Sequence, residues 1–376
     1  MRSWTTSFFF GLHLYTVKSG LGQSFRESSK GGIMIRRLNT WRLFKSGVIS
    51  FICFTLFYMF DGLNIMLDTW MQFQHHVHLH SFTSHIIILT SSPSATNHSQ
   101  VYPYPHPYRF LINQPRKCLT RNPFLLLLVI GESQDVKARD TIRMTWGNVS
   151  NYRDVDVMML FLVGKSPVMT GAIQRLLEEE STIYEDIVQQ DFLDTYQNLT
   201  LKTLMGMEWV TDFCPNVFYV MKVDNDVFLN VNYLVHQLLH PDLPPRTNYL
   251  TGFIVRHAEP VRNKESKWYI SEEVYPGDTY PPYPLGAAYV FSGDMAQKIY
   301  KVAQEIRVFG IEDAFIGICL YKLNILPTNT PRNMFNGRKI DYHPYTFCNL
   351  VTVHNYKDND LIQVWQQLWR NGVFVC

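Results

Sequence analysis

The sequence predicts an α/β domain built on a mostly parallel sheet with helices on both faces. Three runs that are apolar almost throughout indicate strands, at residues 124–130, 155–163 and 217–223. A run that is apolar at every position is typical of a strand buried on both faces. Helical patterns alternate with these runs, at residues 136–146, 173–180 and 199–213. Because strands and helices alternate, a ligand is expected at the carboxyl ends of the strands.

Composition excludes several classes of protein. The 376 residues are 46% hydrophobic and 18% charged, which is too apolar for a disordered chain. The net charge is +2, but residues 1–46 carry +7 and the remainder −5. The basic charge therefore belongs to a short N-terminal tail and does not form a nucleic-acid-binding face.

Residues 47–67 are predicted to be a transmembrane signal anchor. They are uncharged apart from Asp61 and mostly apolar, and about 20 such residues span a bilayer. A basic cluster precedes them and none follows closely, which places residues 1–46 in the cytosol. That cluster comprises Arg36, Arg37, Arg42 and Lys45. The alternative is a cleaved signal peptide, but no small-residue cleavage site follows the run. Either Met1 or Met34 could start a chain with this topology.

Residues 68–117 are predicted to be a luminal stem. They hold few charges, seven of the thirteen histidines and a Pro/Tyr/His-rich piece at residues 102–109. Such a segment buries little apolar surface, so it would hold the next domain away from the membrane. The histidine-rich run at residues 75–80 could bind a metal, although a solvated low-complexity stem is the favoured interpretation. The domain proper is expected at residues 118–376.

Sequons and cysteines are consistent with a luminal location. Three Asn-x-Ser/Thr sequons follow the predicted anchor, at Asn97, Asn148 and Asn198. The six cysteines lie far apart without a CxxC pair, which excludes a zinc ribbon and a thioredoxin-like site. Five cysteines follow the anchor, so at least one should be unpaired or intermolecular.

Asp224 and Asp226 form the most informative motif. They stand at i and i+2 where the third apolar run ends, so their carboxylates can converge on one hard cation. The alternative is an ordinary acidic turn that caps the next helix.

Two further segments could carry chemistry. Arg139 and Arg143 are four residues apart, on one face of a predicted helix, where guanidinium groups could hold a diphosphate or a uracil edge. The alternative is a solvated helix face with ion pairs. Glu312 and Asp313 open an apolar helical run, which the helix dipole alone would explain, but one of them could be a general base.

Together and in this order, these segments resemble the beta-1,3-glycosyltransferases of glycosyltransferase family 31, and most closely the beta-1,3-galactosyltransferases. The likeness runs from about Cys118 to Cys376. The matching blocks include NPFLLLLV, KARDTIRMTWGN, DFLDTYQNLTLKTLMGMEWV, YVMKVDNDVFLN, PDLPPRTNYLTG, NKESKWYI, AYVFSGDMAQKIYKV and GIEDAFIGICL.

The resemblance implies a GT-A-type nucleotide-sugar-binding fold on a single-pass type II anchor in the Golgi membrane. It implies a hexosyltransferase that moves galactose from UDP-galactose, with inversion, to the 3-hydroxyl of a beta-linked N-acetylglucosamine on a glycoprotein or glycolipid. Asp224 and Asp226 match the Asp-x-Asp motif that holds Mn²⁺ against the donor diphosphate. Asp313 matches the catalytic base, His354 a C-terminal metal ligand, and Arg139 and Arg143 a donor-binding block.

The chemistry of such a transfer agrees with these residues. An inverting displacement needs one base for the acceptor hydroxyl and a divalent ion to neutralise the departing UDP. It needs no covalent nucleophile, and the sequence offers no convincing Ser/His/Asp or Cys/His triad.

The chain departs from the family pattern at two positions. Relatives read YPxYCSGxGYV where this chain has Pro284 for the Cys and Ala288 for the second Gly. The missing Cys would explain the odd luminal count, and Cys214 is the residue expected to have lost its partner. Ala288 would add a methyl group in a loop near the donor and acceptor.

Two alternatives to the galactosyltransferase remain open. One is a UDP-N-acetylglucosamine-dependent enzyme acting on galactose, which differs in the donor pocket. The other is a luminal pseudoenzyme, which Pro284 and Ala288 favour. The retention of all three aspartates, Asp224, Asp226 and Asp313, argues against a pseudoenzyme.

Overall fold

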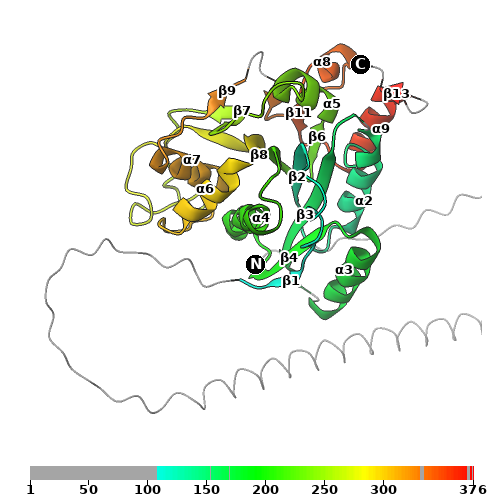
Figure 1. The fold of residues 1–376 in the computed structure, drawn as a ribbon. Helices are drawn as coiled ribbons and strands as arrows, with labels where there is room; N and C mark the ends of the chain where they lie inside the picture. Colours follow the sequence, from blue (N-terminus) through cyan, green and yellow to red (C-terminus); the bar gives the residue numbers. More distant parts are fainter. Residues whose placement is uncertain (1–107, 153, 169, 331–333, 371–372, 375) are drawn as a thin grey trace, which may run out of the picture. The chain divides into compact units, whose positions relative to one another are not determined.

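The computed structural model describes residues 108–376 except 153, 169, 331–333, 371–372 and 375 (Figure 1). The predicted cytosolic tail and signal anchor, the histidine-rich run and Asn97 lie outside the described residues. Among the described residues, no helix has both the length and the apolar character needed to cross a membrane.

An eight-stranded mixed sheet with the order β1-β4-β3-β2-β5-β8-β7-β9 forms the centre of the fold (Figure 1). Its strands are β1 (Phe110–Ile112), β2 (Leu125–Ile130), β3 (Val157–Lys165), β4 (Ile187–Leu193), β5 (Tyr219–Asp224), β7 (Leu250–Val255), β8 (Tyr283–Ser292) and β9 (Thr328–Asn329). The four strands β4, β3, β2 and β5 are parallel. β8 is antiparallel to both β5 and β7.

Helices cover both faces of the sheet, as the sequence predicts (Figure 1). They are α2 (Val136–Met144), α3 (Thr170–Tyr184), α4 (Leu199–Phe213), α6 (Asp294–Ala303), α7 (Glu312–Lys322) and α9 (Asp358–Leu368). Alternate residues of β2 enter two cores. Leu126 and Leu128 pack with α4, α6 and α7, whereas Leu125 and Leu127 pack with α2, α3 and α9. Burial of each of these side chains contributes about 2 kcal/mol, which explains why β2 is apolar throughout.

The strand β4 was not predicted, because two adjacent glutamines interrupt its apolar residues. Gln189 and Gln190 are buried, at 0% and 1% exposure. The Gln189 amide donates to the carbonyl of Gly164, and that of Gln190 donates to Glu208 at 2.6 Å. Because these amides are satisfied by hydrogen bonds, polar residues can occupy a buried strand.

The direction in which strands are added to the sheet reverses at β2. The chain moves outward from β2 through β3 and β4 and then returns to form β5 on the other side of β2. In open α/β sheets this reversal is where ligands bind, at the carboxyl ends of the strands. Asp224 is the last residue of β5 and therefore lies at this edge.

A small second sheet extends that edge. It has the order β10-β11-β6 and consists of β6 (Val227–Leu229), β10 (Phe335–Asn336) and β11 (Thr352–His354). β11 runs antiparallel to β6, and His354 pairs with Val227. This pairing brings the C-terminal part of the chain beside Asp226.

The structure corrects the expectation for Cys214. Cys214 is bonded to Cys118, and Cys348 is bonded to Cys376. Among the described residues, Cys319 is the free cysteine, and it is buried in α7. Sequence separation does not decide a pairing; the first bond joins residues 96 apart, which the fold brings together.

The two departures from the family pattern lie in the strand β8, which corrects the expectation of a loop. Ala288 is 4% exposed and pairs with Val223 of β5, so its methyl group belongs to the core. Pro284 lies beyond the end of the β5 pairing, opposite Ile254 of β7. Proline is tolerated there because one side of the strand needs no backbone N–H donor.

We expect Pro284→Cys to form a disulfide with Cys319. Cys319 is the free cysteine among the described residues, and its helix α7 packs against β8, the strand that carries Pro284. If the bond forms, the number of free thiols in the denatured chain falls by one relative to wild type, and the free energy of unfolding rises by about 2–4 kcal/mol. A count that rises by one would contradict this pairing.

Candidate active site

The candidate site lies where β5, β8, β11 and the start of α7 converge. β5 supplies Lys222 and Asp224, and the turn after it supplies Asp226. β11 supplies His354, and the first turn of α7 supplies Asp313. Three of the segments singled out in the sequence are thus brought to one edge of the sheet.

Asp224, Asp226 and His354 form a potential metal site. Each offers one ligand atom, and the three atoms lie within 4.8 Å of one another. The Oδ1 atom of Asp226 lies 3.4 Å from the Nε2 atom of His354. Two carboxylate oxygens and one imidazole nitrogen suit a divalent ion such as Mn²⁺.

The ring of His354 is oriented for such a role. Its Nδ1 atom lies 3.4 Å from the carbonyl oxygen of Gly337, which can only accept a hydrogen bond. When an ion is bound, a proton on Nδ1 would leave Nε2 free to act as its ligand; without an ion, Nε2 lies within reach of Asp226 as a hydrogen-bond donor. The hydrogen bond to Asp226 raises the pKa of His354. Burial opposes ionisation of Asp226, but the hydrogen bond and the charge of His354 outweigh it and lower the pKa of Asp226.

Lys222 connects the metal cluster to the residues of α7. Its ammonium group donates to Asp224 at 2.6 Å and to the carbonyl of Gly286, and it lies 3.7 Å from Glu312. Burial disfavours the charged form, but Asp224 and Glu312 outweigh it and raise the pKa of Lys222. Sequence reasoning assigned Lys222 no role. The available signal was a single lysine in a strand that is otherwise apolar.

Asp313 is the more accessible of the two adjacent acidic residues. Glu312 is 6% exposed and accepts a hydrogen bond from Tyr289 at 2.7 Å. Asp313 is half-buried, and its Oδ2 atom accepts from the backbone N–H of Gly286 at 3.2 Å. Burial raises the pKa of Asp313. A fixed, partly accessible carboxylate with a raised pKa is suited to proton abstraction.

Gly286 connects Lys222 to Asp313 through its backbone. Its carbonyl accepts from Lys222, and its N–H donates to Asp313. A Cβ at this position would lie 3.4 Å from the carboxylate oxygens of both Glu312 and Asp313. The absence of a side chain therefore keeps the space beside Asp313 open.

Arg139 and Arg143 are engaged by protein carboxylates. Arg139 is 1% exposed and forms two hydrogen bonds to Glu180, at 2.8 and 2.6 Å. Arg143 binds Asp186 through two hydrogen bonds of 2.8 Å and also contacts Glu180. Ion pairs, the alternative weighed for this helix face, therefore describe both residues, but the pairs are buried and not solvated. A direct contact with the donor stays a prediction.

We expect Glu180→Gln to lower the free energy of unfolding by about 3–5 kcal/mol, because it leaves the charge of buried Arg139 uncompensated. Urea denaturation measures this loss. Glu179→Gln is the matched control, since Glu179 is the exposed neighbour on the same helix. Unchanged stability combined with weaker UDP binding would instead favour a donor-binding role for the arginines.

Two exposed aromatic side chains that share a neighbour, Lys267, were missed from the sequence. Tyr196 and Trp268 are 40% and 50% exposed, and the ammonium group of Lys267 lies 5.1 Å and 4.9 Å from their ring centres. Burial raises the pKa of Tyr196, and the charges of Asp313 and Asp224 act in the same direction. The ring of Tyr196 therefore stands within electrostatic range of both carboxylates. Aromatic faces of this kind can stack against a sugar ring.

Comparison with known proteins gives a consistent match. A family model described as "Galactosyltransferase" matches residues 137–331. The chain is 46% identical over 276 residues to "Beta-1,3-galactosyltransferase 2" of Pongo abelii, and this match covers 73% of the chain but only 65% of that relative. It is 40% identical over 264 residues to "Beta-1,3-galactosyltransferase 1" of Mus musculus, covering 70% of the chain and 79% of the relative.

Solved structures match more distantly. One is the "Crystal structure of a glycosyltransferase involved in the glycosylation of the major capsid of PBCV-1", with a TM-score of 0.36 and 10% sequence identity. The match covers 65% of this chain and all of that one. A likeness at this level carries no argument about function.

Proposed function

Because the chain belongs to the galactosyltransferase family, we propose that it is an inverting glycosyltransferase with a GT-A-type fold. Its donor is UDP-galactose, and its acceptor is the 3-hydroxyl of a beta-linked N-acetylglucosamine on a glycoprotein or glycolipid. The observation that carries the proposal is the connection of Asp224 and Asp313 through Lys222 and Gly286. The residues proposed to bind the donor and to act as the base thus lie at one edge of the sheet.

In the proposed reaction, Asp313 removes the proton of the acceptor 3-hydroxyl. The oxygen attacks the anomeric carbon of galactose from the face opposite UDP, and the bond from that carbon to the diphosphate oxygen breaks. Asp224, Asp226 and His354 would hold Mn²⁺, which supplies charge neutralisation on the diphosphate. Lys222 keeps Asp224 in place, and the N–H of Gly286 keeps Asp313 oriented.

We further propose that the enzyme is a single-pass type II protein of the Golgi membrane with residues 118–376 in the lumen. The apolar run at residues 47–67 and the basic cluster before it support this topology. N-glycans at Asn97, Asn148 and Asn198 belong to the same proposal. The two disulfides are consistent with an oxidising compartment.

The test of the function is transfer by the full chain, purified in detergent with Mn²⁺. UDP-galactose and UDP-N-acetylglucosamine are offered separately to acceptors that end in N-acetylglucosamine or in galactose, and the linkage is determined by NMR. Galactose in beta-1,3 linkage to N-acetylglucosamine is the expected product. Transfer of N-acetylglucosamine to galactose would overturn the donor, and no transfer by a folded, UDP-binding protein would support a pseudoenzyme.

Trp268 is expected to contribute to acceptor binding. We expect Trp268→Ala to raise the KM for the acceptor several-fold, because a lost aromatic contact costs about 1 kcal/mol. The KM for UDP-galactose should change little. Tyr321→Ala is the control, since Tyr321 is 70% exposed near the end of α7. Steady-state kinetics with each substrate varied in turn separate the effects; a change confined to the donor KM would contradict this role.

A further inference from the structure

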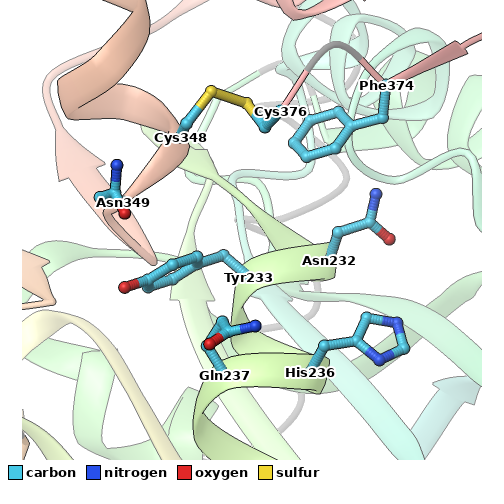
Figure 2. A pocket seen from close by; sticks show the side chains of 8 residues that line it. All are labelled: Asn232, Tyr233, His236, Gln237, Cys348, Asn349, Phe374 and Cys376. Atoms are coloured by element: carbon cyan, nitrogen blue, oxygen red, sulfur yellow. A yellow bond between two sulfur atoms is a disulfide. The ribbon is translucent and has the colours of Figure 1, made fainter.

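A cavity lies apart from the metal cluster, at the opposite end of β6. Asp226 precedes this strand, whereas α5 (Val231–Tyr233) and the π-helix η3 (Leu234–Leu239) follow it. Three strand residues rise about 10 Å, so the cavity and the metal cluster are separate sites. Its volume is about 610 Å³, which is in the range of ligand sites. Eight residues line it: Asn232, Tyr233, His236, Gln237, Cys348, Asn349, Phe374 and Cys376 (Figure 2).

The lining side chains combine amide groups with aromatic rings. Asn232, Gln237 and Asn349 provide three amides, and Tyr233 and Phe374 provide two rings. Among the described residues, the amides of Asn232 and Gln237 have no hydrogen-bond partner. The amide nitrogen of Asn349 donates to the carbonyl of Tyr345 at 2.7 Å, which leaves its oxygen available.

None of the eight lining side chains is a carboxylate, an ammonium or a guanidinium group. The imidazole of His236 lies 3.0 Å from the carboxylate of Asp154, so any charge on the ring is balanced locally. A phosphate, a nucleotide or a peptide rich in charge would find no counter-ion among these side chains. The ligand that fits is therefore uncharged and able both to donate and to accept hydrogen bonds.

The walls of the cavity are held in place by the fold. The disulfide Cys348–Cys376 closes one side (Figure 2). Phe374 packs on Trp369, which stacks on Trp365 of α9. On the other side, Asn230 accepts from the N–H of Tyr233 and donates to the carbonyl of Phe347. A site built on anchored elements loses little entropy when it binds a ligand.

From this chemistry we propose that the cavity is a non-catalytic subsite for a neutral glycan. Sugar hydroxyls both donate and accept hydrogen bonds, as amide groups do, and the apolar faces of sugars stack on rings such as Tyr233 and Phe374. The protein would then bind carbohydrate at two places, the proposed transfer site and this subsite.

The glycan could come from the chain itself or from another molecule. Asp154, the partner of His236, lies six residues after the sequon residue Asn148, which is exposed in the structure. Six residues span at most about 20 Å, so an N-glycan on Asn148 would start near the cavity. The same sugar chemistry would accept a glycan carried by a separate glycoprotein or glycolipid.

Saturation-transfer NMR on the full chain in detergent tests the proposal. The probe is the pentasaccharide core of N-glycans, which ends in mannose and so lacks the terminal N-acetylglucosamine of the proposed acceptor. No UDP-sugar or transfer is needed, so the result does not depend on the proposed function. We expect Gln237→Ala and Phe374→Ala to weaken binding about five- to tenfold, as the loss of one hydrogen bond or ring contact would.

Control variants distinguish the chain's own glycan from an external one, and a lost binding contact from a failure to fold. Gln366→Ala, an exposed glutamine of α9 that does not line the cavity, should bind like wild type. If the chain's own glycan fills the site, the probe binds to Asn148→Gln but not to wild type. If the ligand comes from another molecule, the probe binds to wild type and to Asn148→Gln equally well. Gln237 is exposed, so its variant tests the site even if Phe374→Ala does not fold. Absence of binding in both wild type and Asn148→Gln, or binding unaffected by Gln237→Ala, overturns the proposal.

Discussion

Replacing Asp313 with Asn is expected to lower the rate of sugar transfer by about 10²- to 10⁴-fold, the contribution typical of a positioned general base. The amide keeps the size of the side chain and can still accept from the N–H of Gly286, so the site should stay assembled. Binding of UDP with Mn²⁺ should be unchanged, because Asp313 is not among the three potential metal ligands. Single-turnover transfer and calorimetric UDP binding measure the two effects.

The pH dependence of this variant distinguishes a base from a structural residue. Burial raises the pKa of Asp313, so wild-type activity should rise with pH through that pKa as the carboxylate loses its proton. Asp313→Asn should lack this acidic limb. Asp242→Asn, at an exposed aspartate, should keep the wild-type profile. Transfer by Asp313→Asn at the wild-type rate would assign the base to another residue.

The same raised pKa predicts an effect on stability. A carboxyl group that ionises less readily in the folded state than in the unfolded state stabilises the fold when it is protonated. That contribution is complete below the unfolded-state pKa and is lost as pH rises through the raised pKa. Asp313→Asn should therefore be more stable than wild type at neutral pH and similar to it in acid. Greater stability with lost activity is the pattern of a residue retained for chemistry.

Much of the central sheet follows from the sequence, because strands buried on both faces are mostly apolar along their whole length. The runs around β2, β3 and β5 therefore predict strands without knowledge of the fold. β4 was missed because Gln189 and Gln190 pair with polar groups that only the tertiary structure supplies. The periodicity of apolar residues along a sequence indicates which positions are buried. It does not indicate which hydrogen-bond partners the tertiary structure will supply to a buried polar residue.

The site was predictable only where its chemistry lies within one segment. Asp224 and Asp226 are two residues apart, so their convergence could be read locally. His354 reaches Asp226 only through the pairing of β11 with β6, and its assignment depended on the family resemblance. Lys222 could not be assigned, since its partners Gly286 and Glu312 lie far along the chain. The cysteine pairing failed for the same reason, because spacing does not encode proximity.

Replacing Asp226 should remove metal-dependent donor binding while leaving the other residues of the site in place. In wild type, UDP should bind far more tightly with Mn²⁺ than without it, because the ion neutralises the diphosphate beside two carboxylates. We expect Asp226→Ala to weaken UDP binding in Mn²⁺ by about 100-fold or more and to abolish transfer, since several kcal/mol of charge stabilisation depend on the ion.

UDP binding in the absence of metal is the internal control of this experiment. The ammonium group of Lys222 contacts Asp224 and not Asp226, so the fold around Asp313 should survive in Asp226→Ala. UDP binding without metal should then match that of wild type, and Asp242→Ala should match wild type in both conditions. If Mn²⁺ still tightened UDP binding to Asp226→Ala as strongly as in wild type, the ion would not be held by Asp226. The metal would then depend on Asp224, a carboxylate already paired with a buried lysine, together with His354, or on a site outside this edge of the sheet.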